Sequence, residues 1–115
     1  MELILLLIAP ILFTIGGIIL AFFTPKNINS IFGYKTGQSQ KNQLSWIAGN
    51  KYFGKLLLKF GITYFIICCI LVILSYVNDI SLIFITLSSY VIEIITLIIL
   101  ICKTEKYLRL NNHNS

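Results

Sequence analysis

The chain has 115 residues, of which 57% are hydrophobic and 11% charged, and its mean hydropathy is +0.91. Soluble globular chains are about 25% charged and about 45–50% apolar, so this chain has too little polar surface for a water-facing fold. The composition therefore excludes an ordinary soluble domain, a disordered chain and a disulfide scaffold. We expect one all-α integral membrane domain over residues 1–115.

Three apolar runs are long enough to cross a bilayer, over residues 3–23, 60–77 and 80–102. The first run is expected to be a retained helix and not a signal peptide, because no Lys or Arg precedes it and no small-residue cleavage site follows. Only Asn78 and Asp79 separate the second and third runs, which predicts an antiparallel hairpin. The expected fold is thus a three-helix membrane bundle.

Charge placement predicts how the bundle is oriented. The loop 24–59 carries lysines but no acid, and the tail 103–115 is also basic. By the positive-inside rule both are cytoplasmic, which leaves the N-terminus and the Asp79 turn outside a bacterial cell membrane. We interpret the basic residues behind the net charge of +5 as groups that fix the membrane topology and contact anionic lipid headgroups. The expected partner is therefore the bilayer and not nucleic acid.

Each run also carries small or polar residues at helical spacing, a pattern typical of helix contacts in lipid. We expect these stripes to face one another while Leu and Ile face lipid. The stripes are Pro10, Thr14, Gly17 and Ala21 in the first run, Gly61, Tyr64, Cys68 and Ser75 in the second, and Thr86, Ser89, Tyr90, Glu93 and Thr96 in the third.

Glu93 is the most informative of these residues, since an ionised carboxylate inside the membrane costs several kcal/mol by most scales. Two interpretations stay open. Glu93 is a ligand, proton or partner site, or its carboxyl forms a hydrogen bond to Tyr64, Thr14 or Tyr90 that holds the bundle together.

The loop between the first and second spans has a pattern of its own. Pro25 should end the first helix, and Ser39 is predicted to cap a new helix that starts near Lys41 and continues, as an amphipathic cytoplasmic segment, into the second span.

Trp46, Asn50 and Gly54 share one face of this new helix, because they lie four residues apart. Gly54 allows close approach of another backbone, for which the loop Asn29 to Thr36 is the candidate. Asn50 should bond that backbone with both ends of its amide, and the Trp46 ring should be buried with its N–H in water. A loop folded over the helix and a binding site are both open interpretations.

These residues resemble the SdpI/YfhL family, whose namesake is an immunity protein against the Sdp peptide toxin of Gram-positive bacteria. The resemblance covers about the C-terminal half of the namesake. The family usually has Arg where this chain has Lys35, and lysine lacks the planar bidentate contact of a guanidinium. The matching residues are Pro25, Asn29, Gly33, Tyr34, Lys35, Thr36, Ser39, Trp46, Asn50 and Gly54.

The resemblance implies immunity against a membrane-active peptide toxin, with signalling through a cytoplasmic repressor protein recruited to the membrane. The alternative is a structural or accessory subunit of a larger membrane complex. A channel would need an oligomer, since three spans cannot enclose a pathway alone. We expect no enzymatic activity, cofactor or metal, because the sequence has a single histidine, no C-x-x-C and no pair of nearby carboxylates.

Overall fold

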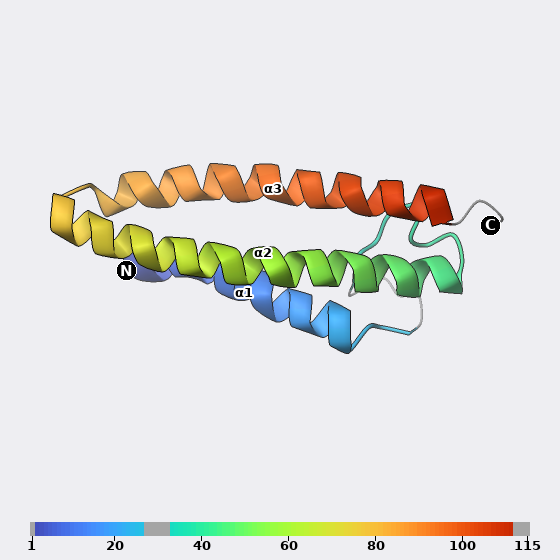
Figure 1. Cartoon of the computed structure of the whole chain (residues 1–115). Coiled ribbons are helices and arrows are strands. Elements are labelled where there is room, and N and C mark those ends of the chain that lie inside the picture. Colours follow the sequence, from blue (N-terminus) through green and yellow to red (C-terminus); the bar gives the residue numbers. More distant parts are fainter. Residues whose placement is uncertain (1, 27–32, 112–115) are drawn as a thin grey trace.

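A computed structural model describes residues 2–26 and 33–111, and it contains three α-helices within these ranges. They are α1 (Glu2–Phe22), α2 (Gln43–Asn78) and α3 (Leu82–Asn111). Figure 1 shows α2 and α3 as two long rods side by side, with the shorter α1 running along α2. The molecule measures 56 × 22 × 19 Å, so it is an elongated bundle. The predicted all-α three-helix architecture is confirmed.

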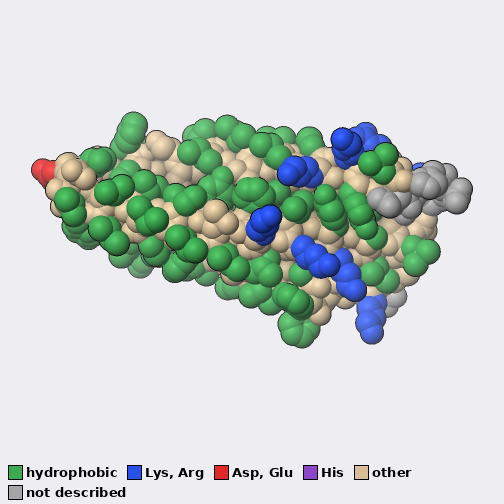
Figure 2. Space-filling view, in the orientation of Figure 1, with side chains coloured by type: hydrophobic (Ala, Val, Ile, Leu, Met, Phe, Trp, Pro, Cys, Tyr) green, Lys and Arg blue, Asp and Glu red, His purple; other side chains and the backbone are tan. Residues whose placement is uncertain are grey.

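All three helices are long and apolar enough to cross a membrane. Their outward faces carry exposed Ile, Leu and Phe side chains along the full length of each apolar stretch. Figure 2 shows the same distribution, with hydrophobic side chains covering most of the visible face. Lipid tails are the solvent that suits such a surface, and the chain is therefore a multi-pass membrane protein.

The contact between α1 and α2 is close because glycines on both helices leave no side chain between the backbones. A Cβ placed on Gly54 would lie 2.6 Å from the backbone nitrogen of Ala21, and one on Gly61 would lie 2.5 Å from Thr14 Oγ1. A Cβ on Gly17 would overlap the backbone nitrogen of Leu58. Small residues drive this kind of packing in lipid, where helices gain little from hydrophobic burial.

The third helix completes the core, and nine of the thirteen stripe residues are buried in it, as expected for stripes that face one another. Buried residues of the three stripes are Pro10, Gly17 and Ala21 on α1, Gly61, Cys68 and Ser75 on α2, and Thr86, Glu93 and Thr96 on α3.

The hairpin between α2 and α3 is tight, as its short link predicts. Asp79 adopts the left-handed conformation (φ 57°, ψ 37°) that ends α2, and its N–H bonds the carbonyl of Ser75. Ile80 N–H also bonds that carbonyl, and Ser75 Oγ donates to Ile80 O at 2.6 Å. These contacts satisfy the free carbonyls of the last turn, so the chain reverses direction within three residues.

The helix ends differ from the apolar runs in ways that matter for the site. The helix expected near Lys41 starts at Gln43 and is continuous with the second span, as predicted, while its amphipathic cytoplasmic character stays a prediction. α3 begins at Leu82 and continues beyond Cys102 as far as Asn111. The N-terminal turns of α2 and the C-terminal turns of α3 therefore extend together beyond the end of α1 (Figure 1).

Candidate functional site

The loop between α1 and α2 is fixed to α2 through a paired contact between Asn50 and Tyr34. The Tyr34 N–H donates to Asn50 Oδ1 at 2.6 Å, and Asn50 Nδ2 lies 3.4 Å from Tyr34 O. Nδ2 also donates to Trp46 O at 2.8 Å within the helix. Asn50 is fully buried. The prediction that its amide bonds the approaching loop backbone at both ends is confirmed.

Gly33 makes this close approach sterically feasible. Its φ of +121° lies in the region that L side chains rarely adopt. A Cβ here would also lie 2.8 Å from Asn50 Oδ1 and 3.0 Å from the Trp46 ring. Glycine is thus required at this position for two reasons, backbone conformation and space.

Trp46 ties the same loop to α2 from the other side. Its side chain is fully buried, and its Nε1–H donates to the carbonyl of Pro25 at 2.7 Å. The prediction that this N–H lies in water is wrong, because the Pro25 carbonyl, just after α1, accepts its hydrogen bond. Pro25 and Tyr34, which flank the segment 27–32, are therefore both held against one turn of α2.

Ser39 and Thr36 close a turn within the loop. Ser39 Oγ accepts from the Thr36 N–H at 2.8 Å and donates to Tyr34 O at 2.9 Å, while the Ser39 N–H donates to Thr36 Oγ1 at 3.1 Å. The prediction that Ser39 caps α2 is wrong. Asn42 is the cap, and its Oδ1 accepts from the Ser45 N–H at 2.8 Å, because Ser39 is already occupied within the turn.

Glu105 on α3 extends the contact to the third helix. One oxygen, Oε2, accepts from Tyr34 Oη and from Thr36 Oγ1, each at 3.0 Å. The Tyr34 ring stacks on Phe53 of α2 with centroids 4.7 Å apart. Burial and the neighbouring Glu105 carboxylate raise the pKa of the Tyr34 phenol above its ordinary value, so Tyr34 stays a neutral donor.

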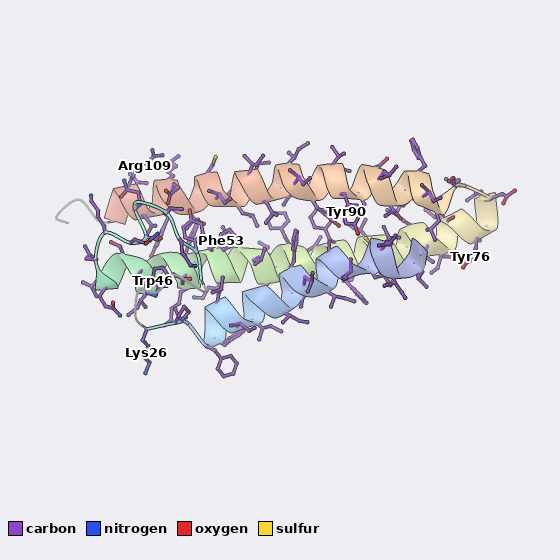
Figure 3. All side chains as sticks on the ribbon, turned by 180° about the vertical axis from the view of Figure 1, so that it is seen from behind. Lys26, Trp46, Phe53, Tyr76, Tyr90 and Arg109 are labelled. Atoms are coloured by element: carbon purple, nitrogen blue, oxygen red, sulfur yellow. The ribbon has the colours of Figure 1, made fainter. Side chains whose placement is uncertain are left out.

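Together these residues form one connected set that joins the loop to α2 and α3, which we call the loop anchor. Figure 3 shows Trp46 and Phe53 of this region at the end of the bundle where the loop folds back onto the helices. The loop anchor consists of Gly33, Tyr34, Thr36, Ser39, Trp46, Asn50 and Glu105.

Sequence reasoning missed Glu105, which it assigned to a basic tail. A signal was present, because Leu100, Thr104 and Leu108 continue the helical spacing of α3 past Cys102, and all three are fully buried. Extending the third helix along that spacing would have placed Glu105 on the loop side.

Three other predicted site residues lie in different surroundings. Gly54 is approached closely by Leu20 and Ala21 of α1, not by the loop as predicted. Lys35 is half-buried between the two loop residues that contact Glu105. Asn29 lies outside the residues that the structure describes.

The predicted intramembrane polar residues Tyr64, Tyr90 and Glu93 each form a hydrogen bond with a different partner. Tyr64 Oη bonds Thr96 Oγ1, and Tyr90 Oη donates to the carbonyl of Leu5, so each tyrosine joins two helices. Figure 3 shows Tyr90 on the middle part of α3, far from the loop anchor. Both tyrosines therefore hold the bundle together inside the membrane.

Glu93 is 3% exposed, and the three hydrogen-bond partners predicted for it are wrong. Ser89, one turn earlier on α3, donates to its Oε1 at 3.0 Å because the two residues are four apart. Among the described residues no partner bonds its Oε2.

The loop anchor is chemically suited to holding a loop in one position. Most of its hydrogen bonds join its own members, the Trp46 N–H bonds Pro25 O, and every residue in it is buried or half-buried. Buried hydrogen-bond networks of this kind fix a unique local structure. This network thus holds the loop against α2 and α3 at one end of the bundle.

Comparison with known proteins places these residues in a family. A family model described as the SdpI/YfhL protein family matches residues 26–103, which include every residue of the loop anchor except Glu105. The "Uncharacterized protein YfhL" of Bacillus subtilis (strain 168) is 39% identical over 51 residues, which cover 44% of this chain and 46% of that protein. No solved structure matches the chain significantly. Because the family model covers well over half of its length, the chain belongs to the SdpI/YfhL family.

Proposed function

We propose that this membrane protein is an immunity factor that protects its cell against a membrane-active peptide toxin. The observation that carries the proposal is that six of the ten motif residues, Gly33, Tyr34, Thr36, Ser39, Trp46 and Asn50, come together in one network, the loop anchor. A motif spread over 30 residues that converges on one structure supports a retained family function. Since one fold can carry different functions, the assignment to immunity rests on the resemblance.

We place the loop anchor on the cytoplasmic side, with the N-terminus and the hairpin outside. Figure 2 supports this orientation, because the blue lysine and arginine side chains of the visible face lie over one half of the molecule and the red acidic tip lies at the other end. Lysine and arginine favour cytoplasmic segments. In this orientation the exposed surface around the loop anchor is available to a cytoplasmic repressor, the second partner that the resemblance implies.

A survival assay tests the proposed immunity. The chain is expressed in a toxin-sensitive Gram-positive host that lacks its own immunity protein, and the cells are challenged with an Sdp-type peptide. We expect the wild type to protect, and Asn50→Ala to lose protection because the loop is no longer held. Lys55→Ala, an exposed lysine on the same helix, should protect like the wild type.

Membrane levels of each variant are measured alongside survival. A wild type that reaches the membrane and leaves the host fully sensitive would contradict immunity to this peptide. Stable co-purification with a larger membrane complex would then favour the accessory-subunit function.

A further inference from the structure

A groove lies where α1 ends and α2 continues beyond it, and it has a volume of about 680 Å³. Phe22, Phe23 and Lys26 line one side, from the end of α1 and the coil that follows. Ile47 and Lys51 of α2 line the other. Figure 3 shows Lys26 on this coil, beyond the end of α1 and on the side of α2 that carries Trp46.

One part of the groove is apolar and lies at the depth of the membrane interface. Phe22 and Phe23 are 71% and 72% exposed, and they end the first span. A membrane span ends where the hydrocarbon core gives way to lipid headgroups, so the end of α1 brings these two rings near that level. The groove therefore offers a surface for the upper part of an acyl chain.

The other part is basic. Lys26 and Lys51 are both exposed and come from separate segments on opposite sides of the groove. Among the described residues that line it, none is acidic. Each lysine near an anionic surface contributes about 1 kcal/mol to binding, or about fivefold in affinity.

We propose that this groove binds an anionic phospholipid, with the phosphate between Lys26 and Lys51 and an acyl chain along Phe22 and Phe23. An amphiphile uses both parts of the groove, whereas free phosphate would use only the lysines. This inference is independent of the proposed immunity function.

Binding at this site would act directly on the loop. Pro25, which accepts the hydrogen bond from Trp46 Nε1, is the residue before Lys26. A phosphate held by Lys26 would thus restrain the chain next to the Pro25 carbonyl that Trp46 bonds. The lipid would stabilise the loop anchor from the membrane surface.

Native mass spectrometry of the detergent-purified protein tests the proposal by titration with phosphatidylglycerol, phosphatidylcholine or inorganic phosphate. The test variant is Lys26→Gln/Lys51→Gln. The matched control is Lys55→Gln/Lys59→Gln, which removes the same charge from exposed lysines that do not line the groove. All four positions are exposed, so both variants should fold, and circular dichroism checks that they do.

We expect phosphatidylglycerol to bind the wild type and the control equally, and the groove variant about 25-fold more weakly. Phosphatidylcholine should bind all three weakly. Equal weakening in both variants would overturn the proposal, because it would show contact with lysines in general. Equal binding of phosphatidylcholine, or displacement of the lipid by inorganic phosphate at similar concentration, would also overturn it.

Discussion

Gly17→Ala should destabilise the bundle, while Gly16→Ala, one residue earlier, should not. A Cβ on Gly17 overlaps backbone atoms of Leu58, and backbone cannot rotate away as a side chain can. The helices must therefore separate, which we expect to cost about 1–3 kcal/mol of unfolding free energy, the usual range for overpacking.

The neighbouring glycine is a well-matched control. A Cβ on Gly16 would meet only the Leu57 Cδ2 atom at 3.5 Å, an ordinary contact. Both substitutions gain the same helix propensity of Ala over Gly, up to about 1 kcal/mol. The thermal unfolding midpoint in detergent should fall for Gly17→Ala and stay level or rise for Gly16→Ala. Equal midpoints for the two variants would contradict the close packing of α1 on α2.

Asn50→Ala should release the loop from α2. The Tyr34 N–H would lose its acceptor in a buried place, at a cost of about 1–3 kcal/mol. The second amide contact, to Trp46 O, is lost as well. Trypsin cleavage after Lys35, followed by mass spectrometry, reports how often the loop opens.

We expect cleavage at this bond to become at least tenfold faster in Asn50→Ala than in the wild type. Gln40→Ala, which changes an exposed side chain in the same loop, should leave the rate unchanged. Slow cleavage in all three proteins would mean that Asn50 does not hold the loop.

Much of the bundle could be predicted because lipid imposes simple rules. The lengths of the apolar runs predicted three spans, and the spacing of small residues predicted which face of each span is buried. Asn50 was also predictable, since a buried amide four residues from both a tryptophan and a glycine needs backbone partners. The hairpin followed from a link too short for any other connection.

Two of the errors share a cause, because each depends on which group reaches a hydrogen-bond donor or acceptor first. Ser39 could cap a helix by its residue type, but its hydroxyl is used by Thr36 and Tyr34. Glu93 could reach across the bundle, but Ser89 is nearer on its own helix. Three-dimensional geometry decides such competition, and the spacing of residues along the chain does not show which group is nearer.

Cysteine labelling in intact cells tests the central claim that the loop anchor lies on the cytoplasmic side and the hairpin on the other. Cys68, Cys69 and Cys102 are first replaced by Ser, and then Lys41→Cys or Ser81→Cys is introduced at an exposed position. A membrane-impermeant maleimide should label Ser81→Cys in intact cells, and Lys41→Cys only after the membrane is opened. Labelling of Lys41→Cys from outside would contradict the orientation and, with it, a cytoplasmic role for the family motif.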